Sequence, residues 1–119
     1  MDIRRAFGNA GEQMAERYLK QKGYRILHRQ FRTRYGEIDL IALDGDEIVF
    51  VEVKARSSNV FGFPEESVTQ EKLRKIFLVA NQYMNDVTEY ASFRIDVVAI
   101  LQTKNETQVM HLEAVGGGA

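Results

Sequence analysis

One hairpin-like segment constrains the fold of this chain more than any other. Two runs of alternating apolar residues, 37–43 and 48–54, flank the sequence Asp-Gly-Asp-Glu at 44–47. An Asp-Gly pair between such runs predicts a β-hairpin, because it favours a tight turn whose twist matches that of the strands. Pairing Leu43 with Ile48 keeps the apolar faces in step, whereas a slip by one residue would turn one strand over. We therefore expect a sheet built around this hairpin.

The same register brings charged side chains together at the open end of the hairpin. Asp39 would face Glu52, and Glu37 would face Lys54. Two carboxylates with Cβ atoms about 5 Å apart repel by roughly 3 kcal/mol at an effective dielectric constant near 20. A divalent cation would remove this repulsion, and Lys54 beside it would suit phosphoryl chemistry. The alternative interpretation is a pair of solvated strand ends with an ordinary cross-strand ion pair.

Two segments have the periodicity of amphipathic helices. Residues 9–22 predict a helix with Asn9 as its N-cap and Gly23 as its stop. Thr69 is expected to cap a second helix. The apolar residues that recur at three- and four-residue steps in this second helix, and so predict its buried stripe, are Leu73, Ile76, Phe77, Ala80 and Met84.

Three further segments predict strands, namely 24–31, 93–101 and 108–115. Residues 32–36 form a polar connector, and residues 55–66, which hold the only proline, predict a surface loop. The element order is then helix-strand-strand-strand-helix-strand-strand. This order favours an α/β or α+β architecture, with helices packed on a mixed sheet.

Length and composition narrow the class of protein. The 119 residues predict a single domain over 1–115 and a flexible Gly-rich tail over 116–119. No cysteine is present, which excludes disulfides and Cys-ligated zinc. No stretch approaches 18 consecutive apolar residues, and the first residues lack the apolar run of a signal peptide. We expect a cytoplasmic protein without a membrane partner.

The formal net charge of -1 conceals an uneven distribution. Up to Gly36 there are nine Lys and Arg against three Asp and Glu, whereas seven basic residues face fourteen acidic ones from Glu37 onward. Near-neutrality therefore does not exclude a nucleic-acid partner. His28 and His111 are expected on polar strand faces, and Asp96 is expected to be exposed or ion-paired.

The hairpin residues resemble a known family. The motifs Gly-Glu-Ile-Asp-Leu-Ile-Ala at 36–42 and Val-Phe-Val-Glu-Val-Lys-Ala-Arg at 49–56 are similar to those of the YraN-like family of uncharacterised small bacterial proteins. Residues 8–12, 22–24, Lys72 and 93–97 extend the resemblance over nearly the whole chain. That family in turn looks related to the PD-(D/E)xK nucleases, which include archaeal Holliday-junction resolvases. The resemblance implies a restriction-endonuclease-like α/β fold with a mixed five-stranded sheet flanked by helices.

The resemblance also implies roles for individual residues. Asp39 and Glu52 match the two metal-binding acids of the nuclease motif, and Lys54 matches its lysine. Glu12 matches the helical Glu that resolvase-type members add to the metal site, although a capping box with Asn9 is the alternative. The motif's Pro before Asp is replaced by Ile38, and Glu37 is expected as an accessory acid.

The implied activity is Mg²⁺- or Mn²⁺-dependent hydrolysis of phosphodiester bonds in nucleic acid, with DNA, branched DNA included, as the expected substrate. A homodimer is suggested by analogy with resolvases. The alternatives are a catalytically inert nucleic-acid-binding module and a protein-interaction domain. The basic side chains expected to contact the nucleic acid are Arg32, Arg34, Arg56 and Lys72.

Overall fold

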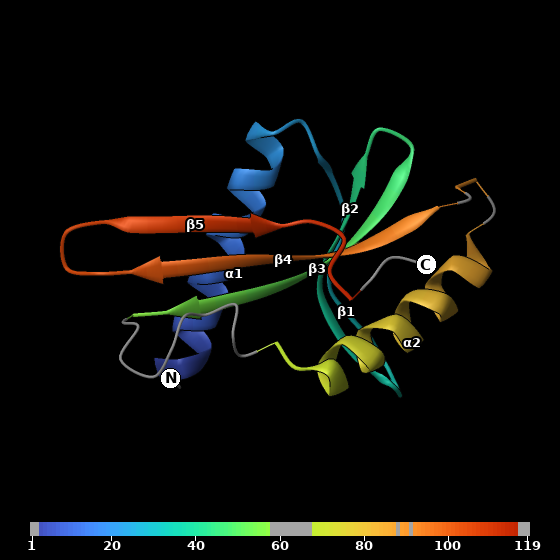
Figure 1. Ribbon diagram of the computed structural model, residues 1–119, viewed down its shortest axis with the longest axis horizontal. Coiled ribbons are helices and arrows are strands. Elements are labelled where there is room, and N and C mark those ends of the chain that lie inside the picture. Colours follow the sequence, from blue (N-terminus) through green and yellow to red (C-terminus); the bar gives the residue numbers. More distant parts are fainter. Residues whose placement is uncertain (1–2, 58–67, 88, 91, 117–119) are drawn as a thin grey trace.

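Five strands form one mixed sheet whose spatial order follows the chain. The computed structural model describes residues 3–57, 68–87, 89–90 and 92–116, and of residues 3–9 it describes the backbone alone. The sheet order is β1-β2-β3-β4-β5 (Figure 1). The elements are α1 (Ile3–Gln21), β1 (Arg25–Thr33), β2 (Gly36–Asp44), β3 (Glu47–Arg56), α2 (Gln70–Asp86), β4 (Phe93–Gln102) and β5 (Thr107–Leu112). The predicted α/β class and element order are thereby confirmed.

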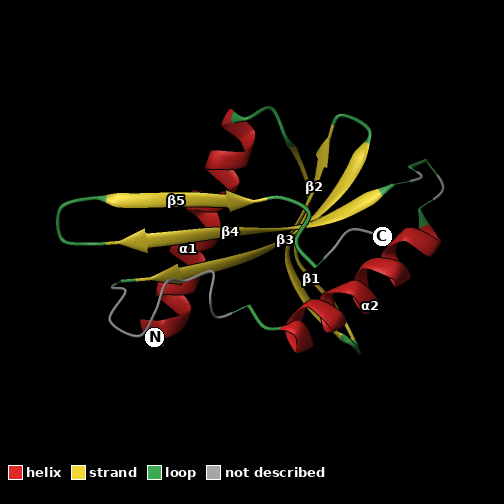
Figure 2. Ribbon diagram, in the orientation of Figure 1, coloured by secondary structure: helices red, strands yellow, loops and turns green. Residues whose placement is uncertain are grey.

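Only one neighbouring pair in this sheet is parallel. β1, β2 and β3 form an antiparallel meander, and β4 and β5 form an antiparallel pair. β3 and β4 run parallel, because the chain crosses between them through α2. α1 and α2 lie on opposite sides of the twisted sheet (Figure 2). A crossover helix on one face and the first helix on the other give the three layers that bury the central strands.

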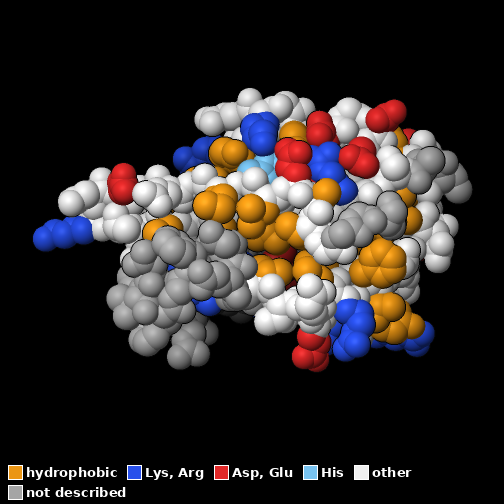
Figure 3. Space-filling view, viewed as in Figure 1, with side chains coloured by type: hydrophobic (Ala, Val, Ile, Leu, Met, Phe, Trp, Pro, Cys, Tyr) orange, Lys and Arg blue, Asp and Glu red, His pale blue; other side chains and the backbone are white. Residues whose placement is uncertain are grey.

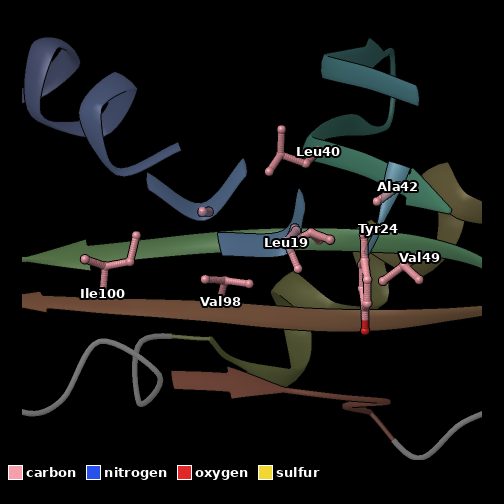
Figure 4. Packing of buried hydrophobic residues seen from close by; sticks show 9 residues of the cluster. Leu19, Tyr24, Leu40, Ala42, Val49, Val98 and Ile100 are labelled. Carbon is pink, nitrogen blue, oxygen red and sulfur yellow. The ribbon is translucent and has the colours of Figure 1, made fainter. Parts of the chain in front are cut away.

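Each face of the sheet carries its own hydrophobic core. Val49 and Val51 of β3 point to the α1 face, whereas Ile48 and Phe50 point to the α2 face. Successive side chains of β3 therefore point alternately into the two cores, as expected for a strand that is covered on both faces. Figure 4 shows side chains of the core on the α1 face, which consists of Ala15, Leu19, Tyr24, Leu40, Ala42, Val49, Val51, Val98 and Ile100.

α1 begins earlier than the sequence pattern predicts. The helix includes Ile3–Gln21, so Asn9 is an interior residue and the predicted N-cap at Asn9 is wrong. The predicted stop at Gly23 is confirmed, because Gly23 has a φ of +95° and its N–H donates to the Lys20 carbonyl at 3.0 Å. The N–H of Tyr24 donates to the Leu19 carbonyl at 3.0 Å, which completes a Schellman motif.

α2 follows the prediction closely. The side chain of Thr69 accepts a hydrogen bond from the Lys72 N–H at 3.2 Å, which confirms the N-cap. The buried residues of α2 are Ile76, Val79 and Ala80. Phe77, predicted within the buried stripe, is 39% exposed, so that part of the prediction is wrong.

Two predicted segments differ from the structure or lie outside it. The predicted loop 55–66 begins too early, because Ala55 and Arg56 still belong to β3, while 58–67 lie outside the described residues. Residues 117–119 of the predicted tail also lie outside them. Neither described helix is both long and apolar enough to cross a bilayer.

A buried polar network lies where the α1 core meets β4 and β5. Asp96 is fully buried and accepts hydrogen bonds from the Arg94 guanidinium at 3.0 Å and from the Ala114 N–H at 3.0 Å. The His111 side chain is 2% exposed, and its Nε2 lies 2.7 Å from Asp96 Oδ2. Asp96 is thus ion-paired but not exposed, and the predicted polar face for His111 is wrong.

The contacts of His111 determine which of its nitrogens carries the proton. Lys22 Nζ lies 2.8 Å from Nδ1 of the ring, and an ammonium group has donors only. Nδ1 must therefore accept, and Nε2–H donates to the Asp96 carboxylate. Burial alone would raise the pKa of Asp96, but the hydrogen bonds from His111 and Arg94 lower it. Asp96 therefore stays ionised inside the core, where the Arg94 guanidinium supplies the opposite charge and its hydrogen bonds are satisfied.

Candidate metal and nucleic-acid site

The predicted register of the β2–β3 hairpin is confirmed from the turn as far as Leu40, the neighbour of Asp39. Paired positions run from Asp44 with Glu47 through Leu43 with Ile48 to Leu40 with Val51. Beyond Leu40 the two strands no longer pair, so the expected cross-strand pairs of Asp39 with Glu52 and Glu37 with Lys54 are not formed. Instead, the Asp39 carboxylate accepts a hydrogen bond from the Val53 N–H at 2.8 Å. The acceptor for the Val53 N–H is thus the Asp39 side chain and not a backbone carbonyl of β2.

The alternation of side chains along β2 is broken at Asp39. Leu40 and Ala42 belong to the core on the α1 face, but Ile38 belongs to the core on the α2 face. In a regular strand Ile38 and Leu40 would share a face. The alternation is therefore broken between them, which turns the Asp39 carboxylate toward β3.

The neighbouring strand has a matching irregularity. Arg29 pairs with Leu40 and Phe31 pairs with Ile38, so Gln30 lies opposite Asp39. Gln30 has a φ of +50°, a left-handed conformation that is unusual for a residue other than Gly. Its Nε2 donates to Glu12 Oε2 of α1 at 3.1 Å. The sequence pattern did not identify Gln30, because nothing in its residue type indicates a strained backbone.

Asp39 and Glu52 are partly buried acids that lie close enough for the charge of Glu52 to oppose the ionisation of Asp39. Burial, followed by the charges of Glu52, Glu12 and Glu37, raises the pKa of Asp39 to about 7, although the Val53 N–H acts to lower it. Burial also raises the pKa of Glu52, whereas Lys54 and Lys72 lower it. Two acids held this way are costly to ionise without a cation.

Two lysines lie close to Glu52. Lys54 Nζ is 3.4 Å from Glu52 Oε1, and both side chains are largely buried, at 17% and 13% exposure. Lys72, in the first turn of α2, reaches the same place. The Lys54 side chain and partial burial lower the pKa of Lys72, while Glu52 and Asp39 raise it. Lys72, predicted as a phosphate contact, therefore stands beside the acids and not on a distant flank.

Glu12 is held near the site by α1. Because α1 starts at Ile3, Glu12 is not at the third helical position, and the capping-box alternative is wrong. The Glu12 carboxylate accepts from Gln30 and raises the pKa of Asp39 through its charge. Among the described side chains, however, no three His, Cys, Asp or Glu are grouped closely enough to hold a metal ion by themselves.

The remaining predicted residues lie around the site. Glu37 accepts from Arg32 Nε at 3.0 Å across the β1–β2 hairpin. Arg34 donates to the Tyr35 hydroxyl at 2.8 Å and lies 5.0 Å from its ring centroid. Arg56 is exposed near the end of β3, two residues after Lys54.

Basic side chains do not form one continuous patch on the face shown in Figure 3, where Lys and Arg lie scattered among Asp and Glu. Arg29, part of the basic run before the hairpin, is bound through Nη2 at 2.9 Å to Glu16 of α1. Of the four predicted phosphate contacts, Lys72 is the one whose charge interacts with Asp39 and Glu52.

The donor set suits a hard divalent cation. Mg²⁺ takes oxygen ligands and is usually bound by one or two carboxylates, with water and phosphate oxygens completing its shell. Asp39 and Glu52 supply two carboxylates, and one Asp39 oxygen is oriented by the Val53 N–H. Since their mutual repulsion falls when a cation lies between them, these two residues fit such an ion.

Comparisons with known proteins identify close relatives. Residues 11–100 match the model of the uncharacterised protein family UPF0102. The chain is 45% identical over 114 residues to a UPF0102 protein of Alkaliphilus oremlandii, covering 93% of this chain and 97% of the relative. It is 42% identical over 118 residues to one of Beutenbergia cavernae, covering 98% and 100%. Another, from Syntrophomonas wolfei, is 42% identical over 111 residues, covering 92% and 96%.

Proposed function

The chain belongs to the UPF0102 family, and we propose that it is a metal-dependent, nuclease-like protein that hydrolyses phosphodiester bonds in nucleic acid, with DNA as the expected substrate. Family membership confirms the resemblance that the hairpin motifs indicate. The relation to PD-(D/E)xK nucleases stays a hypothesis, because the relatives carry no stated activity.

One observation carries the proposal. Two partly buried acids, Asp39 and Glu52, have raised pKa values where the hairpin ladder ends, through burial of both and through the charge of Glu52 on Asp39, and Lys54 lies 3.4 Å from Glu52. A structural role explains neither the broken ladder nor the buried like charges, since both cost stability. Perturbed acids beside a fixed cation are typical of catalytic sites.

Each residue then has a chemical task. Asp39 and Glu52 would hold Mg²⁺ or Mn²⁺, with Glu12 and Glu37 as accessory acids. Such an ion, when bound, supplies Lewis acidity and lowers the pKa of a coordinated water. Lys54 orients the attacking water or stabilises the charge that develops on the phosphate. Lys72 and Arg56 bind neighbouring phosphates, with Arg32 and Arg34 extending the contact along the strand.

Metal binding is tested by thermal unfolding. Mg²⁺ or Mn²⁺ at 100 times its dissociation constant should stabilise the wild type by about 2.7 kcal/mol. Asp39→Asn should lose this effect, whereas Asp46→Asn in the exposed β2–β3 turn should retain it, because Asp46 lies at the far end of the hairpin. An equal metal effect in all three proteins, or none in any, would overturn the site.

Turnover is tested on linear, nicked, flapped and four-way DNA with either metal. We expect cleavage of at least one of these by the wild type and none by Lys54→Ala. Cleavage that survives Lys54→Ala would count against the mechanism, because a contaminating nuclease is indifferent to the substitution.

One observation favours a second candidate, an inert nucleic-acid-binding module. The described side chains form no ready three-ligand metal group. For this candidate we expect salt-sensitive DNA binding that depends on Lys72 and Arg56, with every DNA substrate left intact.

A further inference from the structure

The two edge strands of the sheet, β1 and β5, are built differently. Natural proteins protect an edge strand with charged side chains, bulges or irregular backbone, because its unpaired N–H and C=O groups otherwise pair with another chain. β1 has all three devices: three arginines, a register shift between Ile26 and His28, and the left-handed Gln30. This edge is therefore a poor template for a further strand.

β5 has none of these devices. The strand Thr107–Leu112 contains no Asp, Glu, Lys, Arg or Pro, and none of its six residues has a positive φ. It pairs with β4 in an unbroken register, from Thr107 opposite Gln102 to Leu112 opposite Val97. A regular strand of six residues presents a row of backbone donors and acceptors about 20 Å long along its outer side.

The outer side of β5 is open for pairing. β5 is the last strand of the sheet, and no other described strand pairs with its outer side. The β4–β5 hairpin projects at one end of the molecule (Figure 1). Met110, near the middle of β5, is 48% exposed. An unprotected edge with an exposed apolar side chain favours the addition of another strand.

The sequence of β5 suits pairing with a second copy of itself. Direct cross-strand partners point to the same face, so Met110 lies on the face of Ala99. A two-fold axis perpendicular to the sheet at Met110 places this side chain opposite its equivalent in the second copy, and Gln108 opposite Leu112. The two apolar Met110 side chains then cover each other. No like charges oppose each other, because residues 108–112 contain no Asp, Glu, Lys or Arg.

We infer that two copies of this chain associate edge to edge through antiparallel β5 strands, with Met110 at the two-fold axis, to form one continuous sheet. A contact of this kind is isologous, the commonest type between identical subunits. Because a strand pair is small beside the roughly 1,200–2,000 Å² of a standard interface, the association should depend on protein concentration. It goes beyond the proposed function and does not require turnover.

The same geometry places both acidic centres on one face of the continuous sheet. Glu52 shares the α2 face with Phe50, and it lies beside Val97, which pairs with Leu112 of the edge strand. A two-fold axis perpendicular to the sheet keeps this face common to both copies. The two β3 strands are then five strand spacings, or about 24 Å, apart across the sheet. Under the proposed function, a nucleic acid that spans this distance contacts both centres.

Sedimentation velocity over a wide range of protein concentration tests the association. The wild-type mass should double from 13.6 kDa as concentration rises. Met110→Lys, which places like charges at the axis, should stay monomeric. Leu78→Lys on α2 is the matched control, because Leu78 is 46% exposed and lies outside β5, and it should dimerise as the wild type does. A wild type that stays monomeric, or a folded Met110→Lys that still dimerises, would overturn the interface.

Single cysteines test the register, since the chain has no cysteine of its own. Direct antiparallel partners have Cα atoms about 4.5–5.5 Å apart, a separation that a disulfide spans. Met110→Cys should therefore form a covalent dimer with diamide. Gln108→Cys, on the same face, should not, because its two copies lie about 14 Å apart along the strands.

Equal cross-linking of both cysteine variants, or none with Met110→Cys, would contradict the pairing at Met110. This second assay does not depend on how Met110→Lys folds. Neither assay contains metal or nucleic acid, so a failure of the interface leaves the nuclease proposal standing, and a failure of metal binding or cleavage leaves the interface standing.

Discussion

Replacing Asp39 by Asn should stabilise the metal-free protein at neutral pH, although it removes a side chain from the proposed centre. The Asn carboxamide retains an oxygen that can accept from the Val53 N–H, so the hydrogen bond at the end of the ladder survives. The charge that burial and Glu52 oppose is removed. The variant therefore separates the cost of the charge from the benefit of the hydrogen bond.

The magnitude follows from the pKa of Asp39. Its carboxyl has an ordinary pKa of 3.8, which rises to about 7 in the folded protein. Between these values the folded state binds more protons than the unfolded state, so the free energy of unfolding decreases as pH rises. At about 1.4 kcal/mol per unit, up to about 4 kcal/mol is lost above pH 7. The Asp39→Asn variant avoids this loss, and we expect a gain of about 2 to 4 kcal/mol.

Urea unfolding in EDTA at pH 4, 6 and 8 measures the difference. The advantage of Asp39→Asn should be small at pH 4, where Asp39 is protonated in the folded state, and largest at pH 8. Asp46→Asn, exposed in the turn, should stay within about 0.5 kcal/mol of the wild type throughout. A destabilised Asp39→Asn at pH 8, or an advantage independent of pH, would refute the reasoning.

Three other substitutions test the packing around the site, each by equilibrium unfolding. Arg94→Met should cost about 3 to 5 kcal/mol, because it leaves the buried Asp96 without its guanidinium; a loss below about 1 kcal/mol would mean that His111 suffices. Gly11→Ala should cost about 1 to 3 kcal/mol, since its Cβ would lie 2.9 Å from that of Ala55; an unchanged midpoint would show that α1 shifts freely. Thr69→Ala should cost about 1 kcal/mol through loss of the α2 cap, and no loss would show that the cap is dispensable.

The central hairpin could be predicted from sequence because its information is local. A turn dipeptide and two alternating strands specify one register, and Leu43 pairs with Ile48 as expected. The Thr69 cap is local in the same sense. The start of α1 was mispredicted because Asn9 has the residue type of a cap, yet helical hydrogen bonding continues through it to Ile3.

The candidate site could be predicted only in part. Asp39, Glu52 and Lys54 stand out by charge at strand ends, and the structure brings them together. The end of the ladder at Leu40 was not predictable, because it depends on the turned strand opposite, where Gln30 is left-handed. Strain of this kind is imposed by tertiary contacts and leaves no pattern in residue type.

The buried Asp96 network was missed for a related reason. A single polar residue in an apolar strand is usually exposed or at an edge, so the alternation in β4 suggests nothing more. Arg94 lies two residues away on the same strand, but His111 and Ala114 reach Asp96 only when β5 pairs with β4. Burial of an ion pair is therefore a property of the assembled sheet and not of any one segment.

The hydrogen bond from Val53 to Asp39 makes the backbone itself a sensor of the centre. An amide proton that points at a carboxylate changes its resonance frequency when that carboxylate gains a proton or a cation. The ¹⁵N-labelled Val53 amide, 2.8 Å from Asp39 Oδ2, can thus follow titration and metal loading without any substitution at the acids. The residue most directly informative about the chemistry is an apolar valine, read through its main chain.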